Sequence, residues 1–242
     1  MKKSKSKVLR NILIGVGSFI LVVILVLGYL GFMPGVSALF GSSTPKDLGV
    51  KYTAQDFASA HAKMGSLMQE STATAITDSI KYSGSKPVTA SFTNEELTAT
   101  ANSGKWKYRP VKDVQVKVSP DGTVEVSGKI IKKNIDKVAQ VYGYTTDDIK
   151  KGEEIIGFVP GNPTFYAKGK ATVTNNQVNL DIQELQIGKI DAKNMISEGE
   201  AQSIIDSGIS QVPGLNVKSM TFSDGKMNFD GTVPASISRV VN

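Results

Sequence analysis

The chain has 242 residues, no cysteine and a formal net charge of +6 at pH 7. The lack of cysteine excludes disulfide bonds and cysteine-ligated metal sites, so the fold must rest on an apolar core. Residues 1–33 hold five basic and no acidic groups, which leaves 23 basic and 22 acidic groups in the rest of the chain. Because basic and acidic groups nearly cancel outside residues 1–33, the charge gives no reason to expect a nucleic-acid partner.

An uncharged apolar run covers residues 12–33 and follows five basic residues, Lys2, Lys3, Lys5, Lys7 and Arg10. About 20 apolar residues, at roughly 1.5 Å each, cross a bilayer core, and basic residues beside a span stay on the cytoplasmic side. We therefore expect four parts: a cytoplasmic basic tail at 1–11, a transmembrane signal anchor at 12–33, a linker at 34–46 and an extracytoplasmic α+β domain at 47–242.

The alternative interpretation of the apolar run is a cleavable signal peptide, because Val36-Ser37-Ala38 offers the small residues that a signal peptidase accepts. The apolar part of a signal peptide has about 7–15 residues, so the length of this run favours an uncleaved anchor. Cleavage after Ala38 stays open. Since an exported chain without cysteine fits a bacterial surface, we expect a single-pass protein of a bacterial cell membrane, with its N-terminus in the cytoplasm and its C-terminal domain outside.

Two capping boxes predict helix starts. Thr53 with Asp56 begins a predicted amphipathic helix over residues 52–69, and Thr93 with Glu96 begins a second, short helix. Further helical stretches are expected at about 134–142, 146–151 and 198–207.

Strands are predicted where apolar and polar residues alternate around tight turns. Residues 114–118 and 124–130 flank Asp121-Gly122, and the pattern that starts there recurs 103 residues later at Asp224-Gly225. A third hairpin is expected over 165–187, with a β-bulge near Glu184 where the apolar parity shifts. These elements predict an α+β fold in which amphipathic helices cover a long, curved antiparallel sheet of β-hairpins.

Small and soft side chains gather on the predicted apolar faces. Ala167, Gly169 and Ala171 share one strand face, where either a helix backbone packs closely or an open groove remains. Methionine suits a yielding apolar pocket but is also ordinary in a core. The candidate residues for an apolar ligand groove are Phe57, Met64, Met68, Ala167, Gly169 and Ala171.

Basic and aromatic residues interleave at the start of a cationic stretch, residues 105–137, which holds nine basic and four acidic groups. One interpretation is a solvated surface; the other is contact with anionic phospholipid headgroups or wall polymers. The candidate residues for contact with an anionic surface are Lys105, Trp106, Lys107, Tyr108 and Arg109.

The sequence offers no catalytic constellation. His61 is the only histidine and lies on the apolar edge of its predicted helix, so a packed, hydrogen-bonded role is expected. Ser83 and Lys86 have the spacing of penicillin-binding enzymes, but Pro87 begins a predicted strand and no Lys-Thr-Gly follows. We therefore expect no enzyme activity, no metal site and no cofactor.

The basic tail, the single anchor, the helix start Thr93-Asn94-Glu95-Glu96-Leu97 and the repeated Asp-Gly hairpins resemble bacterial membrane-anchored envelope proteins with a TULIP-like (tubular lipid-binding) domain. Residues 92–102, 111–130 and 217–233 carry the resemblance. It implies a long sheet wrapped around a helix to form an apolar groove, and a role in handling lipids or envelope polymers. It implies no catalytic residues.

The sequence-based hypothesis is a membrane-tethered extracytoplasmic protein that binds lipid or another amphiphile of the cell envelope. The alternative is a non-enzymatic scaffold or interaction domain for a membrane or cell-wall synthesis complex. Membrane lipid is the expected partner, and envelope proteins or an anionic wall polymer are further candidates. The sequence identifies neither the ligand nor the oligomeric state.

Overall fold

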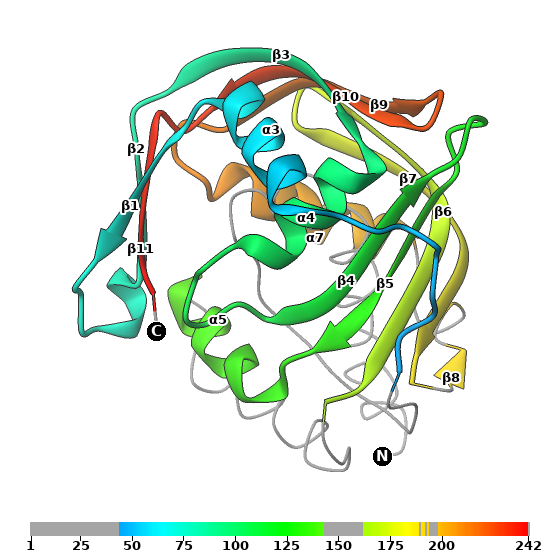
Figure 1. The fold of residues 1–242 in the computed structure, drawn as a ribbon, viewed down its shortest axis with the longest axis horizontal. Coiled ribbons are helices and arrows are strands. Elements are labelled where there is room, and N and C mark those ends of the chain that lie inside the picture. The colour runs from blue at the N-terminus through cyan, green and yellow to red at the C-terminus, as the bar shows by residue number, and fades with distance from the viewer. Residues whose placement is uncertain (1–43, 143–161, 189, 192, 194–197, 242) are drawn as a thin grey trace.

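A computed structural model describes residues 44–142, 162–188, 190–191, 193 and 198–241. These residues form a mixed α/β fold whose antiparallel sheet curls into a half-barrel over a few helices (Figure 1). The expected anchor at 12–33 and the expected helix at 146–151 lie outside the described residues. Within the described part of the chain, no helix has the length and hydropathy needed to cross a membrane.

The main sheet has eight strands within the described part of the chain. Their neighbour order is β3 (Lys86–Thr93), β10 (Lys226–Val233), β9 (Asn216–Ser223), β6 (Thr164–Thr174), β5 (Val124–Ile130) and β4 (Val111–Val118), and β7 (Gln177–Ile187) joins β6 to β8 (Ile190–Asp191). The three predicted hairpins are therefore confirmed as β4–β5, β6–β7 and β9–β10. The expected bulge is present as well, because Glu184 pairs with Lys168 whereas Ile182 pairs with Gly169.

The two repeated Asp-Gly turns meet at the middle of this sheet. Strand β6 pairs with β5 as far as Gly169 and then with β9 from Val173, so the tips of the two hairpins adjoin there. The Asp224 N–H donates to the Pro120 carbonyl at 3.2 Å. At Gly122 the backbone φ is +81°, and an added Cβ would lie 2.5 Å from the Phe222 carbonyl oxygen. Glycine is required at this contact because any side chain would displace the opposing backbone.

A second sheet contains β1 (Leu67–Ser71), β11 (Ser236–Val240) and β2 (Ile80–Ser83), with β1 parallel to β11. The Thr53 capping box is confirmed at the start of α3 (Ala54–Met64). The prediction that this helix continues to residue 69 is wrong. Gly65 ends it in the left-handed conformation, with φ +62° and its N–H donating to the His61 carbonyl, and the chain then enters β1. Helical spacing of Leu67 and Met68 was coincidental, because glycine at this position stops the helix.

Helix α4 (Asn94–Ser103) lies along the edge of β4, and its own capping box is confirmed. Asn94, Thr98 and Asn102 are four residues apart, so they share one helix face. Each of these side chains accepts from the N–H and donates to the C=O of one valine of β4, at 2.7–3.3 Å. The partners, in the same order, are Val118, Val116 and Val114. The helix thus completes the hydrogen bonding of an edge strand as a neighbouring strand would.

Helix α7 (Glu198–Ser210) packs against β7, another outer strand of the sheet. The Asp206 carboxylate accepts from the Val178 N–H at 2.7 Å, and the Glu198 carboxylate accepts from the Ile182 N–H at 3.1 Å. The other short helices of the described residues are η2 (Ile76–Asp78), η3 (Lys132–Asn134) and α5 (Ile135–Val141). Helices α5 and α7 fall where the sequence predicts helical stretches.

The residues before α3 cross the outer face of β4, β5 and β6. The Lys46 ammonium lies 3.5 Å from the centroid of the Tyr166 ring, and the Gln115 side chain accepts from the Leu48 N–H at 2.8 Å. The Tyr166 hydroxyl donates to Glu125, and burial together with this bond raises the pKa of Tyr166. The end of the expected linker is therefore attached to the sheet rather than free of it.

Candidate functional site

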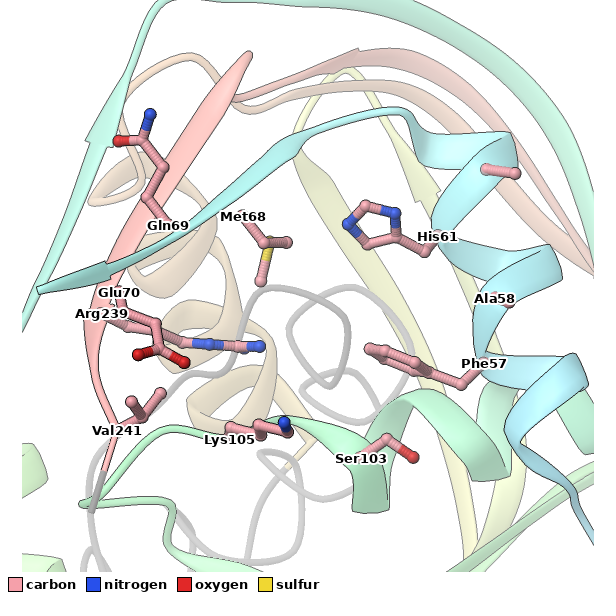
Figure 2. A pocket seen from close by; sticks show the side chains of 11 residues that line it. Phe57, Ala58, His61, Met68, Gln69, Glu70, Ser103, Lys105, Arg239 and Val241 are labelled. Atoms are coloured by element: carbon pink, nitrogen blue, oxygen red, sulfur yellow. The ribbon is translucent and has the colours of Figure 1, made fainter.

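A cavity of about 440 Å³ lies between α3, β1, β11 and the end of α4 (Figure 2). Helix α3 contributes Phe57 and His61 from one face, because residues four apart on a helix lie one above the other. Strands β1 and β11 are in register, so Met68 and Glu70 lie on the same sheet face as Ile237 and Arg239. The remaining lining residues are Ala58, Ala62, Gln69, Ser103, Lys105 and Val241.

The apolar part of the cavity wall comes from α3, β1 and the end of β11. The rings of Phe57 and His61 are 6.2 Å apart, and Met68 faces them from β1. Figure 2 shows Phe57, His61 and Met68 around one side of the cavity, with Val241 at its other end. These side chains are only partly buried, so apolar surface remains available to a ligand.

Among the described residues, the charged part of the wall holds two cations and one carboxylate. Arg239 is only 6% exposed, and Glu70 is its register neighbour on β1. Lys105 follows α4 and is exposed at the rim. Burial lowers the pKa of His61, and the positive charge of Arg239 lowers it further. The lowered pKa favours the neutral form of His61 at pH 7, so the described residues of the cavity wall carry one more positive than negative charge.

The structure divides the six predicted groove residues. Phe57 and Met68 line the cavity together. Met64 is 5% exposed and belongs to the core, as do Ala167 and Ala171 on the inner face of β6. Gly169 is small for a local reason: a Cβ there would lie 2.2 Å from the carbonyl oxygen of Asp181 at the bulge. The Ala-Gly-Ala series therefore reflects a packed sheet and not a groove.

The cationic segment is divided in the same way. Lys105 lines the cavity and Lys107 is exposed outside it. Trp106 is 2% exposed, and its indole N–H donates to the Ser79 hydroxyl, so the prediction of a surface contact for this residue is corrected. The ring of Tyr108 packs edge-on against Trp106, and the Arg109 guanidinium donates to the Asn102 carbonyl at 2.7 Å. Tyr108 and Arg109 therefore hold the segment against the core and α4.

The sequence interpretation missed Arg239, Glu70 and Val241. The only local signal for Arg239 is its spacing, since Ile237, Arg239 and Val241 are two residues apart and so share one face of a strand, although Val240 interrupts the polar alternation. Nothing local connects β11 with β1, which lies about 170 residues earlier in the chain.

A second cavity, of about 400 Å³, lies on the outer face of β3, β10 and β9. Its polar side chains already bond to one another: Thr89 donates to Asp230 at 3.0 Å and Ser91 donates to Asn228. Lys218 forms an ion pair with Asp230 at 2.7 Å. Among the described residues, no group of three or more His, Asp or Glu side chains is placed to hold a metal ion. Ser83 and Lys86 lie at the end of β2 and the start of β3, not on a helix.

The chain matches no protein-family model, no curated protein and no solved structure with which we compared it. The resemblance to tubular lipid-binding domains thus stays an expectation, and the cavity is the feature that points to a function.

Proposed function

We propose that the chain is a membrane-tethered extracytoplasmic binding protein whose cavity between α3, β1 and β11 holds an amphiphile of the cell envelope. The observation that carries this proposal is the composition of the cavity wall. Phe57, Met68 and Val241 supply apolar surface, and Lys105 and Arg239 supply charge. Ligand cavities typically combine a largely apolar wall with a few polar groups that orient the ligand. An amphiphile presents both kinds of surface at once.

Size and position support the same proposal. The volume of about 440 Å³ falls in the lower part of the roughly 300–1,000 Å³ that small-molecule sites occupy. Lys46 is attached to the outer face of the sheet, so the expected linker would hold this residue within roughly 45 Å of an anchor ending at residue 33. A ligand drawn from that bilayer would have a short path to the cavity.

Photolabelling of the full chain tests the proposal. The protein in lipid nanodiscs is irradiated with a long-chain fatty acid that carries a diazirine in its chain, and labelled peptides are mapped by mass spectrometry. We expect adducts in residues 54–71, which contain α3 and β1, and loss of these adducts when excess unlabelled fatty acid is added. Adducts confined to residues 12–33 would contradict the proposal.

Matched tryptophan variants tie the labelling to the cavity. Ala58 and Ala54 are both exposed on α3, one turn apart, and only Ala58 lines the cavity. Ala58→Trp should fill the cavity and lower labelling severalfold, whereas Ala54→Trp should leave it unchanged. Equal labelling of both variants, combined with a defined protein adduct on crosslinking in cells, would favour the scaffold alternative.

A further inference from the structure

Two cationic side chains from different parts of the chain are directed into the same cavity. Figure 2 shows the Arg239 guanidinium and the Lys105 ammonium both pointing toward the space bounded by Phe57 and Met68. Arg239 comes from β11 and Lys105 from the turn after α4. Resting on the proposed function, we propose that the ligand is a single-chain amphiphile with an anionic oxygen head group, which these two cations bind.

The burial of Arg239 makes its charge effective. Arg239 lines the cavity but is only 6% exposed, so its guanidinium is itself poorly solvated. Interactions between charges strengthen as the local dielectric falls. A guanidinium also matches carboxylate and phosphate oxygens in geometry and binds them more strongly than it binds neutral groups.

The other polar groups of the cavity leave room for an anion. Glu70 shares the sheet face of Arg239, and an arginine has five N–H donors, so it can serve a neighbouring carboxylate and a ligand together. Burial and Arg239 lower the pKa of His61, which favours its neutral form at pH 7. Among the described residues of the cavity wall, one carboxylate and two cations therefore favour a negative charge on the ligand and disfavour a positive one.

The apolar wall specifies the rest of the ligand. Phe57, Met68 and Val241 face the charged groups across a cavity of about 440 Å³. This volume lies near the lower limit of roughly 300 Å³ for small-molecule sites, which favours one alkyl chain over the two of a membrane diacyl lipid. Carboxylate and phosphate share the required head-group chemistry, and the experiment separates them.

Competition against the photoactivatable fatty acid tests this inference on the full chain in zwitterionic nanodiscs. The competitors share one alkyl chain and carry a carboxylate, a monoalkyl phosphate, an alcohol or a primary ammonium. We expect one or both anions to suppress labelling of α3 at the lowest concentrations, and the stronger of the two identifies the head group. Equal suppression by the alcohol, or stronger suppression by the ammonium, overturns the inference and leaves the proposed function standing. No suppression by any competitor overturns the proposed function itself.

Lysine variants make the comparison independent of how the competitors partition into the bilayer. Lys105→Gln should weaken competition by the preferred anion about three- to tenfold, because it removes one charge-assisted bond. The alcohol should be unaffected. Lys105→Arg should restore most of the loss, and Lys107→Gln, which alters an exposed lysine outside the cavity, should match the unmodified protein. An equal loss for anion and alcohol in Lys105→Gln would assign Lys105 a structural role and contradict head-group binding.

Discussion

Two outer strands of the main sheet, β4 and β7, are bonded to helices that use different chemistry. At β4, helix α4 presents Asn94, Thr98 and Asn102, whose side chains both donate and accept. At β7, helix α7 presents Asp206 and Glu198, whose carboxylates only accept. Hydroxyl and amide side chains can supply both the donors and the acceptors of a neighbouring strand, whereas carboxylates can supply only the acceptors.

The orientation of α4 on β4 determines which of its sides face α3 and the cavity. Because α4 faces β4 with its polar side, its other sides are free to pack on α3 and to end beside the cavity at Ser103. The side chains that hold α4 therefore position one wall of the proposed ligand site. Variants of the residues that bond α4 to β4 and α7 to β7 separate a structural effect on the sheet edge from an effect on ligand binding.

The largest expected effect is for Thr98→Val. Thr98 is fully buried, and its hydroxyl bonds to both the N–H and the C=O of Val116 at 3.0 and 3.3 Å. Each buried backbone group left without a partner costs about 1–3 kcal/mol, so we expect the free energy of unfolding to fall by about 2–4 kcal/mol. The emission of Trp106, the only tryptophan and a buried one, reports unfolding by denaturant in detergent micelles.

Thr98→Ser is the matched control, because it keeps the hydroxyl and removes one methyl group. It should cost about 1 kcal/mol. If Thr98→Ser and Thr98→Val destabilise the protein equally, packing of the methyl group holds α4, and not the hydrogen bonds to β4.

The edge closure also illustrates what could be predicted from sequence. The hairpins could be predicted because alternation and Asp-Gly turns are local patterns. The four-residue spacing of Asn94, Thr98 and Asn102 is visible on the predicted second helix, but their partners on β4 are set by tertiary packing. The error at residues 65–69 has a local cause, since Gly65 can end a helix whose apolar pattern continues beyond it.

The candidate site could be predicted only in part for a related reason. Phe57 and Met68 were found from apolar spacing, although Met68 belongs to a strand and not to the predicted helix. Lys105 was found as a surface charge, and its place in the cavity depends on β11 reaching β1 from the far end of the chain. The parallel pairing of these strands joins segments with no shared turn, so no local pattern could reveal it.

Asn102→Asp tests the donor requirement at β4. The Asn102 amide donates to the carbonyls of Val114 and Thr98 at 2.7 and 2.8 Å. Aspartate removes both donors and directs a carboxylate at two carbonyl oxygens, so we expect a loss of about 2 kcal/mol in the free energy of unfolding. Glu95→Gln alters an exposed residue of the same helix and should stay within about 0.5 kcal/mol. Equal stability of the two variants would refute the donor requirement.

Acidification should loosen the start of α4. Burial of Glu96 opposes its ionisation, but bonds from the Lys63 ammonium, the Ser59 hydroxyl and the Thr93 N–H outweigh this and lower the pKa. A lowered folded pKa means that the stabilisation is present above the ordinary value of 4.5 and is lost as the pH falls through the folded value. Between pH 7 and pH 3 the protein should therefore lose more stability than Glu96→Gln does. Parallel pH profiles of the two proteins would contradict this role of Glu96.

The smallest expected effect comes from Asp206→Asn at the other edge. Asp206 supplies only an acceptor to the Val178 N–H, and the amide oxygen of asparagine can do the same. The free energy of unfolding should therefore fall by less than about 1 kcal/mol, and hydrogen exchange at the Val178 amide should change little. Asp206→Ala, which removes the acceptor, should accelerate that exchange clearly. Asn102→Asp makes the reverse replacement at β4 and should destabilise the protein far more. If Asn102→Asp and Asp206→Asn lower the free energy of unfolding by similar amounts, β4 and β7 do not differ in their need for side-chain donors.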